Sequence, residues 1–145
     1  MLSYQHGYHA GNFADVVKHT TLSRLLHYLT QKDKPLLYLE THSGRGAYDL
    51  KNAHSLKTAE FKEGIEALWA QKNQLPDVFS LYIKAIKQIN APDTLRYYPG
   101  SPQLAIDALR SIDRLFFSEL HPQEFDHLSQ LLKLGKRVFY SDNDG

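Results

Sequence analysis

Apolar residues recur at helical spacing near the start of the chain. They follow Asn12, a residue type that often caps helix N-termini, and they are Phe13, Val16, Val17, Leu22, Leu25, Leu26 and Leu29. This spacing predicts one helix with a continuous buried stripe. The polar stretch "TQKDKP" at residues 30–35 ends it.

Three short apolar runs have the pattern of strands. Residues 36–39, "LLYL", form an uninterrupted run after a proline, which predicts a strand buried on both faces of a parallel sheet. The runs "RLFFSEL" at 114–120 and "KRVFYSD" at 136–142 predict two more strands. The first run is followed by Glu40 and the second reaches Glu119, so acidic side chains lie where these strands end.

Helical patterns fill most of the remaining chain. Residues 57–72 predict one amphipathic helix and residues 77–90 another, with no strand pattern between them. Their apolar positions are Phe61, Ile65, Leu68 and Trp69 in the first and Val78, Tyr82, Ile83 and Ile86 in the second. We expect about residues 55–90 to form a helical insertion. The segment "RYYPGSP" predicts a turn-rich loop, 102–111 a short helix, and 121–135 a longer one.

Strands that alternate with helices predict an α/β fold with a parallel, doubly wound sheet. Ligands of such folds bind outside the carboxyl ends of the strands. Sheets of this kind have about five strands or more, whereas three are predicted here, so the sheet looks unfinished. The length of 145 residues suits a single domain.

Composition narrows the class of protein. The chain has 42% hydrophobic residues, enough for a core, and 17 basic against 16 acidic residues, so its net charge does not require an anionic partner. It has no cysteine, which excludes disulfides and thiolate metal sites. No secretory signal or long apolar run is found, and we expect a cytoplasmic protein without membrane contact.

The segment "YLETHSGRGAYDL" at residues 38–50 is the first candidate binding loop. Its glycines let the backbone approach a ligand closely, and we expect a helix to start after the turn and offer its amides to a negative group. The G-x-G spacing is also typical of a plain turn. Glu119, at the end of the second predicted strand, is placed to accept hydrogen bonds from ribose hydroxyls, or is a solvated acid.

Two further polar clusters lie near the ends of the chain. The terminal "SDNDG" suits a turn that contacts an adenine edge, or a simple turn, and it lacks the ligands of a calcium loop. Near the N-terminus, His6 and His9 have no zinc-site spacing, and capping or packing roles are favoured. Lys18 and His19 could bind a carboxylate through charge-assisted hydrogen bonds, or be a solvated lysine beside a partly buried histidine.

Four segments together resemble one known family. The stretches "YHAGNFADVVKH", "YLETHSGRGAYDL", "LRYYPGSP" and "SELHP", in this order and spacing, resemble the RlmJ family of methyltransferases. The resemblance covers essentially the whole chain. It implies a class I, Rossmann-like, S-adenosylmethionine-dependent methyltransferase fold. The family has also been described as involved in the catabolism of external DNA.

The resemblance implies methyl transfer to N6 of an adenine in 23S ribosomal RNA, by a monomeric enzyme without a metal. It implies that one group of residues surrounds the methionine portion of S-adenosylmethionine, that Glu119 holds the ribose, and that Tyr4 contacts substrate RNA. The methionine group consists of Lys18, His19, His42 and Ser101. Asp144 and Gly145 would contact the adenine.

The sequence departs from the family pattern at one motif. Amino-methyltransferases of this group use an Asp/Asn-Pro-Pro-Tyr/Phe motif to hold the target base, and residues 1–145 contain none. We therefore expect residues 1–145 to be the N-terminal, cofactor-binding part of a single methyltransferase domain, inactive alone. The alternative is a non-catalytic nucleotide-binding or nucleic-acid-binding module.

Overall fold

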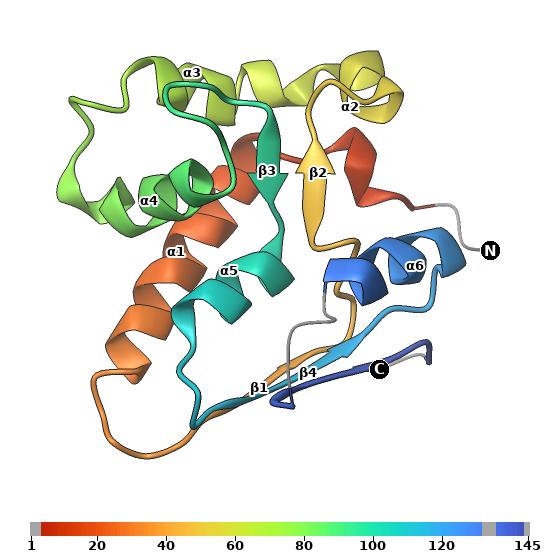
Figure 1. Ribbon diagram of the computed structural model, residues 1–145. Coiled ribbons are helices and arrows are strands. Elements are labelled where there is room, and N and C mark those ends of the chain that lie inside the picture. The colour runs from red at the N-terminus through yellow and green to blue at the C-terminus, as the bar shows by residue number, and fades with distance from the viewer. Residues whose placement is uncertain (1–3, 132–135, 144–145) are drawn as a thin grey trace.

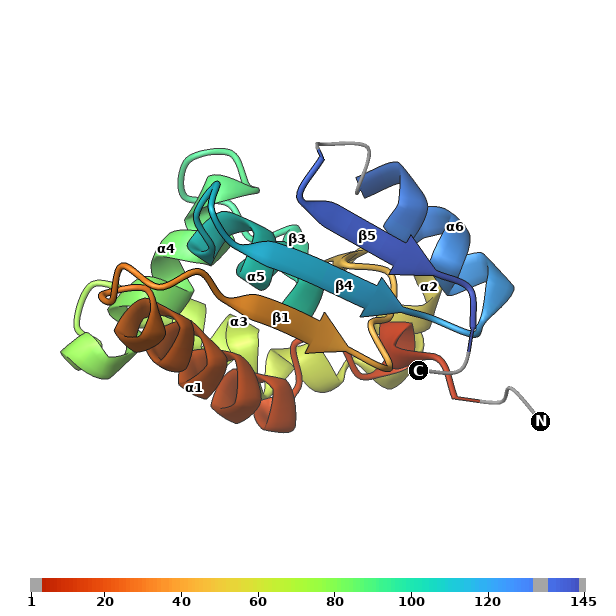
Figure 2. The same ribbon diagram turned by 90° about the horizontal axis from the view of Figure 1, so that it is seen from below.

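The central sheet has three parallel strands. The computed structural model describes residues 4–131 and 136–143. Strands β1 (Leu37–Glu40), β4 (Arg114–Ser118) and β5 (Val138–Ser141) lie in the order β1-β4-β5, and Figure 2 shows them pointing the same way. The three predicted strands and the parallel arrangement are confirmed.

Helices pack on one face of this sheet. They are α1 (Phe13–Leu29), α5 (Ser101–Ala108) and α6 (Pro122–Leu131), and in Figure 2 α5 and α6 lie behind the strands. The core on this face consists of Leu26, Ala105, Leu109, Leu115, Phe117 and Leu128. The predicted start of α1 is confirmed, because the Asn12 side chain accepts a hydrogen bond from the amide of Asp15. None of the helices in the described ranges combines the length and apolar character needed to cross a bilayer.

No element within residues 4–131 and 136–143 covers the opposite face of the sheet. Leu37 and Leu39 of β1 are 72% and 57% exposed, and Phe139 of β5 is 50% exposed. The register places Leu39 beside Phe116 and Phe116 beside Phe139, so these side chains share a face. The prediction that the first strand is buried on both faces is therefore wrong for the described residues, since only the other face, with Tyr38 and Leu115, meets the helices.

Helix α1 is also less completely buried than its pattern predicts. Its buried face consists of Asp15, Val16, His19, Thr20, Ser23 and Leu26. Phe13, Val17 and Leu25, which were predicted to belong to the buried stripe, are at least half exposed. These three residues therefore lie outside the face of α1 that packs against the rest of the described structure.

A second, two-stranded sheet was not predicted from the sequence. Strand β2 (Ala47–Asp49) pairs antiparallel with β3 (Tyr97–Pro99), and Figure 1 shows the pair between the main sheet and the upper helices. Both segments were predicted as loops, because three residues are too few to show a period. The glycine turn therefore leads into a strand, and the helix predicted directly after it is wrong.

The segment between β2 and β3 is helical. It contains α2 (Ala53–Thr58), η2 (Glu60–Lys62), α3 (Ile65–Ala70), η3 (Asp77–Phe79) and α4 (Ser80–Gln88); a further short helix, η1 (His6–Tyr8), precedes α1. This segment packs around a second core, which includes Tyr48, Phe61, Ile65, Trp69, Tyr82, Ile86 and Tyr98. No strand is assigned in it, and all of its residues are described.

The single helix predicted for residues 57–72 is broken twice. Ala59 adopts a left-handed conformation with φ 53° and ends α2. At Gly64 a Cβ would lie 2.1 Å from the carbonyl oxygen of Gly11, and the next amide, of Ile65, donates a hydrogen bond to that oxygen at 2.8 Å. Contact with the segment before α1 thus determines where α3 begins.

Candidate functional site

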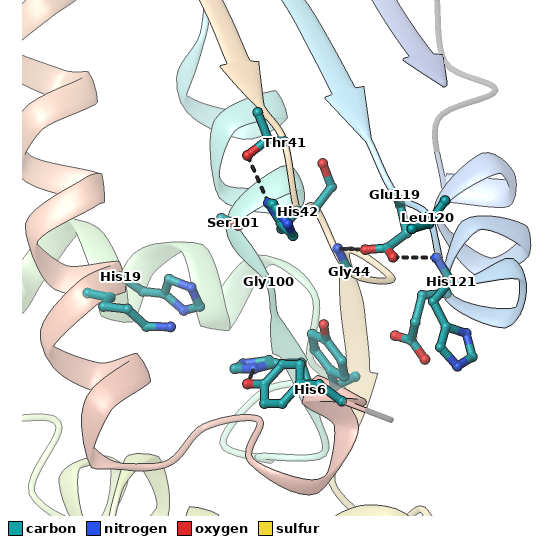
Figure 3. Close-up of a pocket in the computed structure, with 15 residues that line it drawn as sticks. His6, His19, Thr41, His42, Gly44, Gly100, Ser101, Glu119, Leu120 and His121 are labelled. Carbon is teal, nitrogen blue, oxygen red and sulfur yellow. Dashed lines mark hydrogen bonds between the residues drawn. The ribbon is translucent and has the colours of Figure 1, made fainter. Parts of the chain in front are cut away.

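A cavity of about 550 Å³ lies at the carboxyl ends of β1 and β4. Figure 3 shows residues from the N-terminal segment, α1 and the loops after both strands around it. Six predicted site residues line it, namely Tyr4, Lys18, His19, His42, Ser101 and Glu119. Asp144 and Gly145, predicted to contact an adenine, lie outside the described residues. The position is the one that parallel α/β sheets use for ligands.

The first wall is the glycine turn after β1. Gly44 and Gly46 have φ values of 65° and 84°, a region that side chains rarely adopt. A Cβ would also lie 2.5 Å from the Tyr48 hydroxyl at Gly44 and 2.4 Å from the Leu131 side chain at Gly46. Both glycines are therefore required by the path of the chain, and the turn that they form presents residues 41–44 to the cavity.

A close contact between Gly100 and Gly46 brings Ser101 to the glycine turn. The amide of Gly100 donates to the carbonyl oxygen of Gly46 at 2.7 Å, and a Cβ at Gly100 would lie 2.9 Å from that oxygen. This close approach holds the N-terminus of α5 against the turn. The hydroxyl of Ser101 donates to the Glu40 carboxylate at 3.1 Å.

Glu40 is a carboxyl group just beneath the cavity. Burial raises the pKa of Glu40 to about 7, although hydrogen bonds from Tyr38 and Ser101 favour the charged form. The Tyr38 hydroxyl donates at 2.5 Å. The group thus changes charge near neutral pH, next to two side chains, Ser43 and Ser101, that line the cavity.

Glu119 links the loops that follow the two strands. Its Oε2 accepts a hydrogen bond from the amide of Gly44 at 2.7 Å, and its Oε1 accepts one from the amide of His121 at 2.8 Å, as Figure 3 shows. Each carboxylate oxygen can accept more than one hydrogen bond. Glu119 is therefore both a structural bridge and an acceptor with capacity left for ligand hydroxyls.

The N-terminal segment is attached to α1 through a buried carboxylate. Asp15 is fully buried, and its Oδ2 accepts from Nε2 of His6 at 2.7 Å and from the amide of Gly11 at 3.0 Å. Burial alone would raise the pKa of Asp15, but these hydrogen bonds and the nearby histidines lower it to about 2. Lys18 Nζ lies 3.1 Å from the other oxygen of Asp15.

This attachment places Tyr4 over the cavity. The Tyr4 hydroxyl lies 2.7 Å from Nδ1 of His6, and its ring stacks on His9 with centroids 5.6 Å apart. His9 in turn pairs with Glu60 at 3.0 Å. The two histidines considered for metal binding each pair with a carboxylate, and no group of three or more potential metal ligands is found within residues 4–131 and 136–143.

His19 is a buried member of the cavity wall. Burial lowers the pKa of His19 to about 4, although the charge of Asp15 opposes this change. The ring is therefore neutral at physiological pH. Its Nδ1 lies 2.7 Å from the hydroxyl of Tyr98, which leaves Nε2 as the ring nitrogen available to a ligand.

Several lining residues were not among the individual site residues predicted from the sequence. They are His6, Thr41, Ser43, Gly44, Tyr48, Gly100, Leu120, His121 and Glu124. Most are neighbours of predicted residues within the same loops, so loop membership would have found them. Glu124 is different, because it enters through a pair with Arg45 at 2.5 Å that joins the glycine turn to α6, and no spacing in the sequence reveals that pair.

The polar groups at the two ends of the cavity differ in kind. Lys18 and His19, both on α1, can meet a negative group, whereas Glu119 can accept from hydroxyls on the opposite side. The buried hydroxyl of Ser43 lines the cavity and lies beside the Glu40 carboxyl group. The arrangement fits a polar ligand with an anionic group at one end and vicinal hydroxyls toward the other.

The fold and the strand-end cavity define an α/β protein of the Rossmann-like class. Residues 33–145 match the family model described as Ribosomal RNA large subunit methyltransferase D, RlmJ. The chain belongs to this family of methyltransferases. The family and fold class expected from the four sequence segments are thereby confirmed.

Individual relatives agree with this assignment. The chain is 45% identical to Ribosomal RNA large subunit methyltransferase J of Escherichia coli (strain K12) over 145 residues, and 46% identical to the protein of the same name from Haemophilus influenzae over 146 residues. All of the chain is covered in both comparisons, but only 51% and 52% of those relatives. The chain thus spans about half the length of the curated relatives it matches.

A solved structure shows the same fold. A crystal structure of a protein from Legionella pneumophila, str. Philadelphia 1, superposes with a TM-score of 0.86 at 57% sequence identity. The match covers 93% of this chain and 49% of the other.

Proposed function

We propose that the strand-end cavity binds S-adenosylmethionine. We propose further that the chain supplies the cofactor-binding part of an enzyme that methylates N6 of an adenine in 23S ribosomal RNA. The observation that carries the proposal is the convergence of Lys18, His19, His42, Ser101 and Glu119 on one cavity. These residues come from four separate segments of the chain, and the family resemblance of the sequence implies each of them.

Each end of the ligand is matched to the cavity groups whose hydrogen-bonding character suits it. Lys18 and His19 would hold the methionine carboxylate, and Glu119 would accept hydrogen bonds from the ribose hydroxyls. His42 and Ser101, in the glycine turn and at the start of α5, would lie along the methionine portion between them. The proposed adenine contacts of Asp144 and Gly145 and the proposed RNA contact of Tyr4 follow from the resemblance to the family.

The protein's part in the reaction is mainly positional. When bound, the cofactor supplies an electrophilic methyl group. The cavity residues hold and orient it, and Tyr4, on the N-terminal segment, helps to close the cavity from water. Acceptors for the target amine would come from an Asp/Asn-Pro-Pro-Tyr/Phe motif, which residues 1–145 do not contain. Transfer is therefore proposed for a protein that carries this motif as well.

Calorimetry with S-adenosylhomocysteine tests the binding proposal. We expect it to bind the folded chain more tightly than either adenosine or methionine alone, because each of these engages one end of the cavity. A folded chain that binds none of the three would refute the assignment of the cavity.

Transfer is tested with labelled S-adenosylmethionine and unmodified 23S RNA. We expect no N6-methyladenine from residues 1–145 and clear product from a longer protein that includes the motif. Equal product from both would place the catalytic groups within this chain and contradict the proposal. Binding of S-adenosylhomocysteine without transfer by either protein would favour a non-catalytic nucleotide-binding module.

A further inference from the structure

Three buried aromatic side chains form a hydrogen-bonded row that ends at the cavity. His19 on α1 lies 2.7 Å from the Tyr98 hydroxyl on β3, and that hydroxyl lies 2.9 Å from the hydroxyl of Tyr82 on α4. Tyr82 and Tyr98 are fully buried, and His19 is 6% exposed. The row connects the helical segment between β2 and β3 with the wall of the site.

The number of donors determines the direction of these hydrogen bonds. The Tyr82 hydroxyl has no hydrogen-bond partner among the described residues other than Tyr98. If Tyr98 donated to Tyr82, the buried hydroxyl proton of Tyr82 would have no acceptor, which is costly in a protein core. Tyr82 therefore donates to Tyr98, and the proton of Tyr98 is directed to Nδ1 of His19.

The direction of these hydrogen bonds determines which nitrogen of the His19 ring carries the proton. A ring nitrogen that accepts a hydrogen bond carries no proton, and a neutral histidine has one protonated nitrogen. We infer that Tyr98 is a positioning residue that holds His19 as the tautomer with its proton on Nε2, so that the histidine donates a hydrogen bond to an anionic group of the ligand. The identity of that group as the methionine carboxylate rests on the proposed function.

The surroundings of the row support this state. Burial raises the pKa of both Tyr82 and Tyr98, so both phenols remain protonated and able to donate. Figure 3 shows the His19 ring extending from α1 toward Gly100 and the strand tips. Nε2 would supply a neutral hydrogen bond beside the charge of Lys18, which also lines the cavity.

Two-bond ¹⁵N–¹H correlation spectra of the histidine rings test the tautomer without any ligand. In the wild type we expect Nε2 of His19 to appear protonated and Nδ1 unprotonated at neutral pH. The variant Tyr98→Phe removes the donor to Nδ1, and both nitrogens should move toward the values of a mixture of tautomers. A protonated Nδ1 in the wild type, or an unchanged spectrum in a folded Tyr98→Phe variant, would overturn the inference.

Tyr82→Phe is the matched control. It removes a hydroxyl from the same row and the same core, but it leaves Tyr98 free to donate to Nδ1, so the wild-type tautomer should persist. If Tyr98→Phe fails to fold because the Tyr82 hydroxyl is left without a partner, the double variant Tyr82→Phe/Tyr98→Phe removes that hydroxyl too. The double variant should show the same mixture of tautomers, and a retained wild-type pattern in it would equally refute the role of Tyr98.

A pair of histidine substitutions tests which nitrogen meets the ligand. The side-chain amide of Gln reaches about as far as Nε2 and that of Asn about as far as Nδ1. His19→Gln should therefore keep more affinity for S-adenosylhomocysteine, whereas His19→Asn should lose about tenfold or more, as for a hydrogen bond to a charged group. Greater loss in His19→Gln would overturn the assignment of Nε2. If the wild type itself does not bind, the cofactor proposal fails, and the spectra still decide the tautomer.

Discussion

Replacing Glu40 by Gln should stabilise the protein relative to the wild type, and increasingly so as the pH rises. Glutamine resembles the protonated carboxylic acid in shape and charge, and it can still accept a hydrogen bond from Tyr38 or Ser101. Because burial raises the pKa of Glu40 from 4.5 to about 7, the wild-type fold is stabilised when this group is protonated. That stabilisation is fully present below pH 4.5 and is lost as the pH rises through about 7.

The magnitude follows from the size of the pKa change. Each tenfold change in proton affinity corresponds to about 1.4 kcal/mol, so a change from 4.5 to about 7 corresponds to about 3 kcal/mol. Partial exposure of Glu40 reduces this to about 2–3 kcal/mol. His19 has the opposite effect, because its pKa is lowered from 6.5 to about 4 and its stabilisation is lost as the pH falls through that range.

The two effects oppose each other over the same pH range in the wild type. Only the difference between Glu40→Gln and the wild type isolates the carboxyl group. We expect the free energy of unfolding of the variant, relative to the wild type, to increase by about 2–3 kcal/mol between pH 4.5 and pH 8.

Urea unfolding followed by circular dichroism at several pH values measures this difference. Glu63→Gln, which replaces an exposed carboxylate before α3, is the control and should show no such trend. A difference between Glu40→Gln and the wild type that stays constant across the pH range would show that the Glu40 carboxyl is not desolvated in the folded protein.

Other predictions concern the ligand loop and one close backbone contact. Glu119→Ala should weaken S-adenosylhomocysteine binding by about 1–3 kcal/mol in calorimetry, since it removes a charged acceptor, whereas Glu63→Ala should not; equal affinities would exclude the proposed ribose contact. Gly64→Ala should lower the free energy of unfolding by about 1–3 kcal/mol, because its Cβ would collide with the carbonyl of Gly11. Gly7→Ala, whose Cβ would meet only the flexible His54 side chain, should cost less, and similar losses would contradict this explanation.

The sequence was most informative where a period extends over many residues. The cap at Asn12 and the continuous pattern that follows it located α1, and the apolar runs located all three parallel strands. The pattern could not show which faces are covered, because an exposed Leu39 and a buried Leu115 look alike in a short apolar run. Burial of these residues depends on what packs against the sheet.

Features produced by contacts distant in sequence were missed. Strands β2 and β3 have three residues each and are stabilised by one another, so neither is recognisable alone. The break at Gly64 depends on the carbonyl of Gly11, which belongs to a different part of the chain. The resemblance to the family identified many of the residues that line the cavity. The hydrogen bonds between His6 and Asp15 and between His19 and Tyr98 could be found only from the structure.

The pairing of β2 with β3 also bears on how the chain folds. Strands β1 and β4 are neighbours in the main sheet although the whole helical segment lies between them in sequence (Figure 1). Closing so long a loop in one step costs entropy and slows folding. Once Ala47 has paired with Pro99, only the glycine turn and the stretch through α5 separate the small sheet from β1 and β4. Early formation of this pair would convert one slow, long-range closure into two shorter ones.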